Sequence, residues 1–480
     1  MQKELNCYIN GQWAVAQGKE MFDLINPVTE EKTLSYRLGN EADVDNAVSC
    51  ARKAFVGYSQ STREERVNIL QNIVANLEKR KDELSHAISL EMGAPRWFAE
   101  KVQAALALGH AQITLKALQD YQFEKVAGTN LIKFVPIGVC GLITPWNWPA
   151  ALIMCKMLPA IATGCTVVLK PSEDTPLSAA VIAEVMHESG VPAGVFNMVY
   201  GNGPTVGKAL SGHPDINCIS FTGSTRAGID IAINAAPSVK RVVQELGGKS
   251  PNIILPSADI GAKVKAGIKG LMSNAGQTCS APSRMIVPKN KMKDVKKAVA
   301  DTIEKMQPGR PESGSFMGPV INASQYERIQ AYIKSGIDEG ASVLAGGPGK
   351  PDGLEKGYFI KPTVFADTTP KMKIVREEIF GPVLVIQEYD DVTQAIELAI
   401  NTDYGLAAYV QGGDMQEVVK VAEQIPAGQV YCNTSGEFAD LTMPFGGFKK
   451  SGNGREWGAI AFADYLETKA IIGCFPKEKK

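Results

Sequence analysis

Two residues of this 480-residue chain could together form and then hydrolyse a covalent acyl intermediate. Cys279 ends the segment Asn-Ala-Gly-Gln-Thr-Cys, and Glu245 begins the earlier segment Glu-Leu-Gly-Gly-Lys. A thiol can attack an electrophilic carbon, and a carboxylate can activate the water that releases the product. If the fold brings them together, this pair predicts covalent catalysis through an acyl-enzyme.

Most of the nine cysteines are expected to be buried structural residues, because a free cysteine usually behaves as a small hydrophobic side chain. Those that lie in apolar runs are Cys140, Cys155, Cys165 and Cys218. Cys279 differs, since its neighbours are small or polar, and Gly276 and Ser280 allow a tight backbone with exposed amides. We expect this setting to favour the thiolate form of Cys279.

The composition is that of a soluble globular protein with more than one domain. A net charge of −1 argues against nucleic acid or an anionic membrane surface as a partner. The longest apolar stretch, 150–162, contains Lys156 and Pro159 and is too short to span a bilayer. No apolar signal region follows Met1, and the odd number of cysteines favours a reducing compartment, so we expect a cytoplasmic protein. The four histidines are not in metal-ligand spacing, and no metal site is predicted.

Strand-like and helix-like segments alternate between about 139 and 245, which predicts an α/β fold with a buried parallel sheet. The expected strands are 139–144, 166–169, 195–199, 218–221 and 241–245, and the expected helices include 149–163 and 176–189. Ligands bind at the carboxyl ends of the strands in such sheets. Four polar, aromatic or glycine-rich segments follow these strands, namely 144–149, 170–173, 221–224 and 245–248.

A second alternating region follows Cys279, with expected strands at 284–287 and 381–386 and a helix at 292–305. We place the boundary between the two regions near Gly247 and Gly248, which puts the thiol and the carboxylate on opposite sides of a cleft. In the N-terminal region, 7–9 reads as a short strand before a turn at 10–11, and 61–64 has the pattern of a capping box that begins a helix.

Seven motifs in order identify the chain as resembling the NAD(P)-dependent aldehyde dehydrogenases over essentially its full length. They are Pro-Trp-Asn-Trp-Pro at 145–149, Lys-Pro-Ser-Glu at 170–173, Phe-Thr-Gly-Ser at 221–224, Glu-Leu-Gly-Gly-Lys at 245–249, Gly-Gln-Thr-Cys at 276–279, Glu-Ile-Phe-Gly-Pro at 378–382 and Pro-Phe-Gly-Gly at 444–447. The resemblance implies a Rossmann-type cofactor domain, an α/β catalytic domain and a small β flap for oligomerisation.

The same resemblance implies catalytic roles for five residues. Cys279 corresponds to the nucleophile and Glu245 to the general base that activates water. Asn147 corresponds to the side-chain half of an oxyanion hole, with the Cys279 backbone N–H as the other half. Lys156 and Glu456 fall where members of the family have an assisting proton relay. The presence of Glu245 favours hydrolysis of the thioester over transfer to coenzyme A.

The cofactor residues implied by the family lie mainly at the strand ends. They are Thr144, Pro145, Trp146, Lys170, Ser172, Glu173, Gly223, Ser224, Leu246, Glu378 and Phe380. The carboxylate of Glu173 would accept hydrogen bonds from the adenosine ribose and repel a 2′-phosphate, so we expect NAD to be preferred, while NADP remains possible. A near-match to the dinucleotide fingerprint at 201–207 has one residue too many, and we interpret it as a tight turn between strand and helix.

The substrate is less well defined by the sequence than the reaction. Trp148, Leu152, Cys155, Thr278 and Ser280 are expected to line an aldehyde tunnel, and Cys155 replaces what is often a bulky aromatic residue in the family. The loop 435–441 carries Glu437 and Asp440 but no arginine, which disfavours carboxylate-bearing semialdehydes. The expected partner is a small-molecule aldehyde substrate, and the sequence does not identify which aldehyde it is.

Family resemblance also divides the chain into domains and predicts a homo-oligomer. The cofactor domain would comprise 1–117 and 137–247, the catalytic domain 248–447, and the bridging segments 118–136 and 448–480. The predicted hairpin at 121–135 and the strand-like tail at 465–472 would join and pair across subunits in a dimer of dimers.

Two alternatives of other classes are open at this point. A thiol esterase would need Cys279, Glu245 and Asn147 but not the cofactor residues Lys170, Glu173 and Glu378. A non-catalytic NAD-binding protein would be free to lose Cys279 or Glu245, and both are present.

Overall fold

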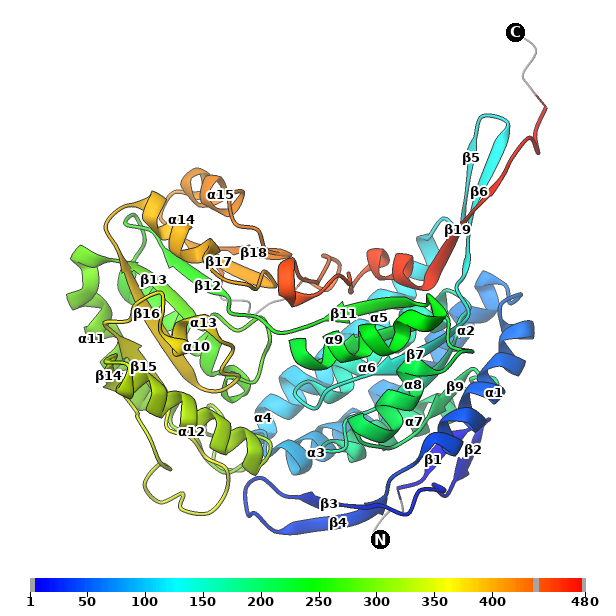
Figure 1. Cartoon of the computed structure of the whole chain (residues 1–480), viewed down its shortest axis with the longest axis horizontal. Helices are drawn as coiled ribbons and strands as arrows, with labels where there is room; N and C mark the ends of the chain where they lie inside the picture. The colour runs from blue at the N-terminus through cyan, green and yellow to red at the C-terminus, as the bar shows by residue number, and fades with distance from the viewer. Residues whose placement is uncertain (1–4, 435–439, 477–480) are drawn as a thin grey trace.

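The computed structural model describes residues 5–434 and 440–476, which form an α/β fold around two large sheets (Figure 1). Each of these sheets has seven strands, and a three-stranded and a two-stranded sheet accompany them. The first large sheet contains strands up to Glu245, and the second begins at Pro251. The expected division of the chain near Gly247 and Gly248 falls between them and stays a prediction.

The first large sheet has the strand order β11-β10-β7-β8-β9-β1-β2. It is parallel from β11 to β9, and β1 pairs antiparallel with β9 and with β2. Its central strands β7, β8 and β10 are wholly buried, as their apolar sequences require. The strands are β1 (Cys7–Ile9), β2 (Gln12–Ala14), β7 (Val139–Ile143), β8 (Thr166–Lys170), β9 (Phe196–Met198), β10 (Cys218–Thr222) and β11 (Arg241–Glu245).

The second large sheet has the order β14-β15-β16-β13-β12-β17-β18, and only β14 runs antiparallel to its neighbour. Its strands are β12 (Pro251–Ile254), β13 (Arg284–Pro288), β14 (Ser342–Ala345), β15 (Thr363–Ala366), β16 (Val383–Tyr389), β17 (Ala407–Gln411) and β18 (Gln429–Cys432). Among these strands, only β13 and β16 were predicted from the sequence.

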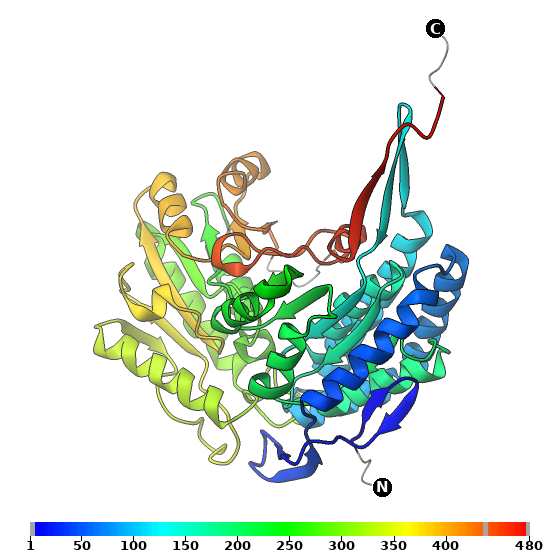
Figure 2. The ribbon, with the colours of Figure 1, turned by 45° about the vertical axis from the view of Figure 1, so that its right-hand side comes forward.

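Helices cover the first sheet on both faces (Figures 1 and 2). The helices in this part of the chain are α1 (Glu41–Tyr58), α2 (Arg63–Lys79), α3 (Lys81–Met92), α4 (Arg96–Phe98), the π-helical turn η1 (Ala99–Ala104), α5 (Ala105–Asp120), α6 (Pro149–Ala162), α7 (Pro176–Glu188), η2 (Gly203–Gly207), α8 (Lys208–Gly212), α9 (Thr225–Ala235) and η3 (Ala236–Ser238). The fingerprint-like segment at 201–207 is a turn that continues into η2 and α8, as interpreted.

The capping box of α2 lies one residue later than the sequence pattern suggested. Thr62, and not Ser61, is the N-cap, and its hydroxyl accepts from the Glu65 backbone N–H at 3.2 Å. The Glu65 carboxylate accepts in return from the Thr62 backbone N–H at 2.7 Å. Ser61 instead donates to the Tyr58 carbonyl, which closes the preceding helix and leaves Thr62 free to cap.

Further helices surround the second sheet. They are α10 (Ile260–Met272), η4 (Ser273–Gly276), η5 (Lys289–Lys291), α11 (Met292–Ile303), η6 (Glu304–Met306), α12 (Ala323–Asp338), α13 (Lys373–Arg376), α14 (Val392–Ile400) and α15 (Met415–Ala422), followed near the C-terminus by η7 (Lys449–Ser451) and η8 (Ala459–Tyr465).

A narrow β sheet projects from the body of the molecule (Figure 2). It has the order β19-β6-β5, formed by β5 (Glu124–Ala127), β6 (Asn130–Pro136) and the tail strand β19 (Leu466–Ile471). The expected hairpin and tail strand are therefore present and pair antiparallel within one chain. A separate two-stranded sheet consists of β3 (Met21–Ile25) and β4 (Lys32–Arg37).

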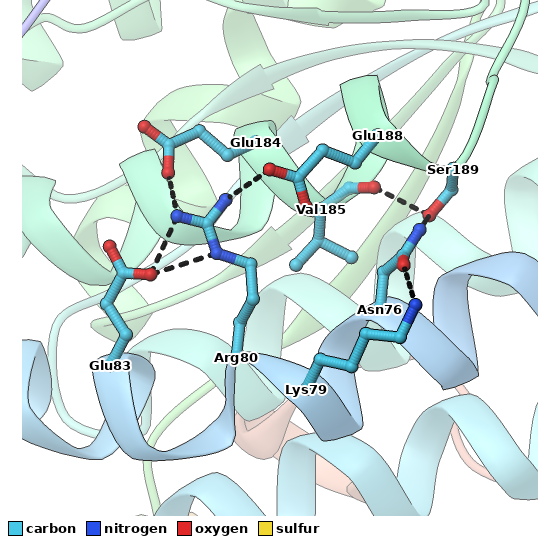
Figure 3. A network of polar contacts seen from close by, with 8 residues as sticks. All are labelled: Asn76, Lys79, Arg80, Glu83, Glu184, Val185, Glu188 and Ser189. Atoms are coloured by element: carbon cyan, nitrogen blue, oxygen red, sulfur yellow. Dashed lines mark hydrogen bonds and ion pairs between the residues drawn. The ribbon is translucent and has the colours of Figure 1, made fainter.

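Helix α7 directly follows the polar segment at the end of β8, and residues of α2 and α3 hold both of its ends; Figure 3 shows the contacts at its C-terminal end. The Arg80 guanidinium, between α2 and α3, contacts the carboxylates of Glu83, Glu184 and Glu188. At the other end, the buried Glu91 carboxylate accepts from the backbone N–H groups of Leu177 and Ser178. These contacts fix the position of α7, and therefore the point at which the segment 170–175 ends.

Among the residues described, none of the helices is both long and apolar enough to cross a membrane.

Candidate active site

The loop before Cys279 is held in an unusual backbone conformation. Asn274, Ala275 and Gly276 have φ values of 52°, 54° and 72°, in the left-handed region that costs energy for residues with a side chain. A Cβ atom on Gly276 would lie 2.1 Å from the Gly381 carbonyl oxygen, so only glycine fits there. Three consecutive left-handed residues make a sharp turn just before Cys279.

Buried amide side chains stabilise this turn and fasten it to Asn147. The Asn274 side chain donates to the Asn147 carbonyl at 2.8 Å, and the Asn147 side chain donates to the Gln277 carbonyl at 3.0 Å. Gln277 donates to the Asn274 carbonyl at 3.0 Å. Asn147 therefore lies directly beside the loop, and one of its two amide hydrogens has no acceptor among the described residues.

The structure corrects the expectation that Cys279 sits in a setting that favours its thiolate. Desolvation by the surrounding protein raises the pKa of Cys279, and the carboxylates of Glu378 and Glu245 raise it further. The backbone N–H groups of Ser280 and Cys279 oppose this but do not outweigh it. The polar flanks were a misleading signal, because the charges that act on the thiol are two carboxylates from other segments.

Glu245 ends β11 with a buried carboxylate that has no hydrogen-bond partner among the described residues. Cβ atoms on Gly446 and Gly454 would lie 2.8 and 2.9 Å from its Oε1, so these glycines leave room for it. Burial raises the pKa of Glu245 well above its ordinary value, with Glu456 adding to the effect. A carboxyl group in this state is suited to accept a proton from water.

Lys156 and Glu456 form a fully buried ion pair between α6 and the C-terminal segment. Burial alone would lower the pKa of Lys156, but the Glu456 carboxylate outweighs it and holds that pKa above its usual value. Lys156 also donates to the Ser220 hydroxyl at 3.2 Å, and the Cys155 thiol lies 3.4 Å from the second carboxylate oxygen of Glu456. The two residues expected to act together are thus in contact.

The residues expected to line a substrate tunnel lie on two facing segments. The Trp148 indole donates to the Thr278 hydroxyl at 3.1 Å, and the Phe98 ring packs against Trp148 with centroids 5.6 Å apart. Cys155 is buried, with its thiol between Glu456 and the Leu152 carbonyl. The tunnel assignment itself stays a prediction.

The Ser280 carbonyl accepts from the Tyr409 hydroxyl at 2.9 Å. Within the loop 435–441, Glu437 lies outside the described residues. The Asp440 carboxylate is described, and it accepts from the Thr442 backbone N–H and hydroxyl.

One group of expected cofactor residues gathers at the ends of β7 and β8. Lys170, at the end of β8, contacts the Pro171 carbonyl at 2.8 Å and the Glu173 carboxylate at 3.2 Å. The Thr144 backbone N–H donates to the Lys170 carbonyl, and the buried Thr144 hydroxyl has no partner among the described residues. The Ser172 hydroxyl accepts from the Asp174 backbone N–H at 3.3 Å.

The N-terminus of α9, where the pyrophosphate of the cofactor was expected, begins at Ser224. Ser224 is the N-cap, and its hydroxyl accepts from the Ala227 backbone N–H. A Cβ on Gly223 would lie 2.4 Å from the Phe221 ring, which explains the glycine. Leu246 is buried and packs beneath Gly228 of α9, so its side chain supports the helix.

A third group surrounds a small cavity beside Cys279, lined in part by Gly248, Thr278, Glu378 and Phe380. Glu378 accepts from the Gly248 backbone N–H at 3.0 Å, and burial raises the pKa of its carboxyl. The Trp146 ring meets the Phe380 ring edge to face at 5.5 Å, and the neighbouring Pro145 is half-buried. The N-terminus of α9 and the carboxylates of Glu173 and Glu378 have the chemistry to contact a dinucleotide, at its phosphates and its riboses.

Several residues that shape the site were not predicted from the sequence. Gln103 donates to Asn274 Oδ1 at 3.3 Å, and Arg328 of α12 donates to the carbonyls of Glu378 and Ile379. On the same helix, Gln325 has a buried Oε1 atom without a partner among the described residues. Their contacts join segments far apart in the chain, and no local pattern reveals such contacts.

Comparison with known proteins identifies the class. The model of the aldehyde dehydrogenase family matches residues 13–471. A 3-succinoylsemialdehyde-pyridine dehydrogenase from a Pseudomonas species is 47% identical over 468 residues, covering 97% of this chain and 98% of that protein. The chain belongs to the aldehyde dehydrogenase family, as its resemblance predicted.

Solved structures agree with the family assignment over the whole fold. Aldehyde dehydrogenase C from Pseudomonas syringae, a cysteine-to-alanine variant in complex with NAD+ and octanal, is 48% identical with a TM-score of 0.97, covering 99% of this chain and 98% of that chain. The NAD+ complex of an aldehyde dehydrogenase from Bacillus cereus is 38% identical with a TM-score of 0.94, covering 98% and 96%.

Proposed function

We propose that the chain oxidises an aldehyde to a carboxylic acid with NAD, through a thioester on Cys279 that Glu245 helps to hydrolyse. The observation that carries the proposal is the convergence of three groups from separate segments. The strained loop fastens Cys279 beside Asn147, and the charge of the unpartnered Glu245 carboxylate, among the described residues, acts on the same thiol.

Attack on the aldehyde begins with loss of the Cys279 proton. Because desolvation and two carboxylates raise the pKa of this thiol, a base has to take its proton before the sulfur can attack. The sulfur then adds to the carbonyl carbon and gives a tetrahedral hemithioacetal anion. The free amide hydrogen of Asn147 and the Cys279 backbone N–H are the donors that would stabilise its oxygen.

NAD, when bound, supplies the acceptor for the hydride that the tetrahedral carbon must lose. The residues that would hold it are Lys170 and Glu173 at the adenosine ribose, the N-terminus of α9 at the pyrophosphate, and Glu378 and Phe380 at the nicotinamide end. Loss of the hydride leaves the acyl group on Cys279 as a thioester. Glu173, as a carboxylate, favours NAD over a cofactor with a 2′-phosphate.

Hydrolysis of the thioester uses Glu245 as the base for water. The carboxylate takes one proton as the water oxygen attacks, the carbon–sulfur bond breaks, and the carboxylic acid leaves. Burial is the main cause of the raised pKa of Glu245, the charge of Glu456 adds to it, and the charge of Lys156 opposes it. We infer that the pair also passes the proton onward.

The substrate class we infer is an uncharged, largely apolar aldehyde. The described segments around the expected tunnel offer the rings of Phe98 and Trp148 and the aliphatic side chain of Leu152. The octanal complex of the related structure supports this inference, since octanal is a linear apolar aldehyde.

The projecting sheet bears on the oligomeric state of the protein. The projecting sheet leaves the outer edge of β5 without a strand partner among the described residues, and such edges invite pairing with another chain. We infer a homo-oligomer, as a dimer of dimers, in the cytoplasm, with the cofactor domain ending near Gly247 and the catalytic domain beginning at Gly248.

A panel of aldehydes tests the function. Octanal, benzaldehyde, glyceraldehyde, 3-aminopropanal and succinate semialdehyde would each be mixed with NAD or NADP, and the absorbance of reduced cofactor followed. We expect the highest kcat/KM with octanal and NAD. A preference for succinate semialdehyde would overturn the substrate class, and a lack of reduced cofactor with every aldehyde would overturn the function.

A further inference from the structure

The start of helix α12 contacts three of the segments that form the candidate site. The Ile321 backbone N–H donates to Gln277 Oε1 at 2.9 Å, in the loop before Cys279. The Asn322 side chain donates to Asp174 Oδ2 at 3.2 Å, in the segment that contains Glu173. Arg328 donates to the carbonyls of Glu378 and Ile379 at 2.6 and 2.9 Å. One end of α12 points toward the helices of the cofactor half (Figure 1).

Asn322 uses both ends of its side-chain amide. Its oxygen caps α12 by accepting from the Gln325 backbone N–H at 3.0 Å, and its nitrogen donates to Asp174. Aspartate or serine would cap the helix equally well. Aspartate has no donor at neutral pH, however, and serine is too short to do both. The hydrogen bond to Asp174 can therefore be removed by substitution of Asn322 while the helix cap is kept.

Asp174 lies next to Glu173 in a segment whose other positions are already fastened. Tyr36 donates to the Glu173 carbonyl at 2.8 Å, and the Asp174 backbone N–H donates to Ser172. After Thr175, α7 begins at Pro176 and is capped by Glu91. The only side-chain hydrogen bond described for the Asp174 carboxylate comes from Asn322, across the boundary between the two large sheets.

We propose that the Asn322–Asp174 hydrogen bond is a strut across the cofactor cleft that positions Glu173 for the adenosine ribose. Asn322 is a positioning residue, since it acts through Asp174 and does not itself touch a reacting atom. The inference rests on the proposed use of NAD and adds a residue from the catalytic half to the control of cofactor affinity.

Four variants separate the effect of the Asn322–Asp174 hydrogen bond from the effects of the helix cap and of charge. Asn322→Ser keeps a capping hydroxyl and removes the strut without adding charge. Asn322→Asp keeps the cap and places two carboxylates together. The double variant Asn322→Asp/Asp174→Asn restores the hydrogen bond in the opposite direction with the wild-type net charge. Asp391→Ser, at the N-cap of α14, changes a cap elsewhere and is the matched control.

The measurements are the Kd for NAD by titration, KM for NAD against kcat with octanal, and the melting temperature. We expect Asn322→Ser to raise Kd and KM for NAD about fivefold to tenfold, the effect of one lost hydrogen bond, while kcat stays near wild type. Asn322→Asp should weaken the binding of NAD more than Asn322→Ser does, and the double variant should recover most of the affinity for NAD.

The measurements distinguish failure of the proposed strut from failure of the proposed use of NAD. A wild-type protein that does not bind NAD would overturn both. Wild-type affinity in Asn322→Ser, a loss equal to that of Asp391→Ser, or an unrepaired double variant would overturn the strut alone. A lower melting temperature with unchanged Kd for NAD would overturn it as well, since the contact would then only stabilise the fold.

Discussion

At the scale of single residues, the chemistry depends on burial more than on local sequence. Cys279 and Glu245 were both identified from their motifs, but the pKa of each is set by segments that the motifs do not contain. The sequence therefore predicts which residues react, and the structure shows which surroundings raise the pKa of each. That difference is a consequence of tertiary contacts.

The raised pKa of Glu245 makes the hydrolysis step dependent on pH. A carboxyl group whose pKa is raised is an available base only above that raised pKa, so the steady-state rate should climb as pH rises through it. Glu245→Gln should slow thioester release about a hundredfold and flatten this rising limb. Rapid mixing should then show a burst of reduced cofactor before a slow steady state.

Absence of the burst in Glu245→Gln, with the first turnover itself slowed, would place Glu245 in activation of the thiol and remove it from hydrolysis. Glu377→Gln, which changes a carboxylate that accepts from the Tyr332 hydroxyl, serves as the control.

Cofactor choice is also decided by a single carboxylate. Glu173→Gln removes a negative charge that would repel a 2′-phosphate, while Lys170 stays in place to attract one. The ratio of kcat/KM for NAD to that for NADP should fall about tenfold, which corresponds to about 1.4 kcal/mol. Asp301→Asn, which removes an exposed carboxylate of α11, should leave the ratio unchanged. A wild-type ratio that already favours NADP would contradict this role of Glu173.

At the scale of elements, the long apolar segments were predictable and the contacts between them were not. The strands β7, β8 and β10 and the helices α6 and α7 lie where alternation placed them, because their buried sequences leave few other arrangements. The predicted capping box was wrong by one residue, because Ser61 and Thr62 can both serve as an N-cap. Asn322 was missed because its partner Asp174 lies far away in the chain.

The ion pair between α6 and the C-terminal segment gives a prediction about stability. Lys156→Met should leave the Glu456 carboxylate buried without its ammonium partner and lower the free energy of unfolding by about 3–5 kcal/mol. Denaturant titration measures it. The double variant Lys156→Met/Glu456→Gln should recover much of the loss, and an equal loss in both variants would mean that packing, and not charge, is responsible.

At the scale of the whole molecule, the projecting sheet is difficult to explain in an isolated chain. Its three strands project away from the body of the molecule, and its two outer edges have no strand partner among the described residues. Such a sheet is only marginally stable by itself. Sedimentation equilibrium at micromolar concentration should therefore give the mass of a tetramer. A monomer mass would refute the assembly, and a dimer mass would leave only the tetramer wrong.

The central claim is that Cys279 carries the acyl group during aldehyde oxidation. Its most direct test is the absorbance of reduced cofactor when octanal and NAD are mixed with wild-type protein and with Cys279→Ser, after titration has shown that both bind NAD. The wild type should produce reduced cofactor continuously, and the variant should produce none above background. Turnover by Cys279→Ser near the wild-type rate would contradict the claim.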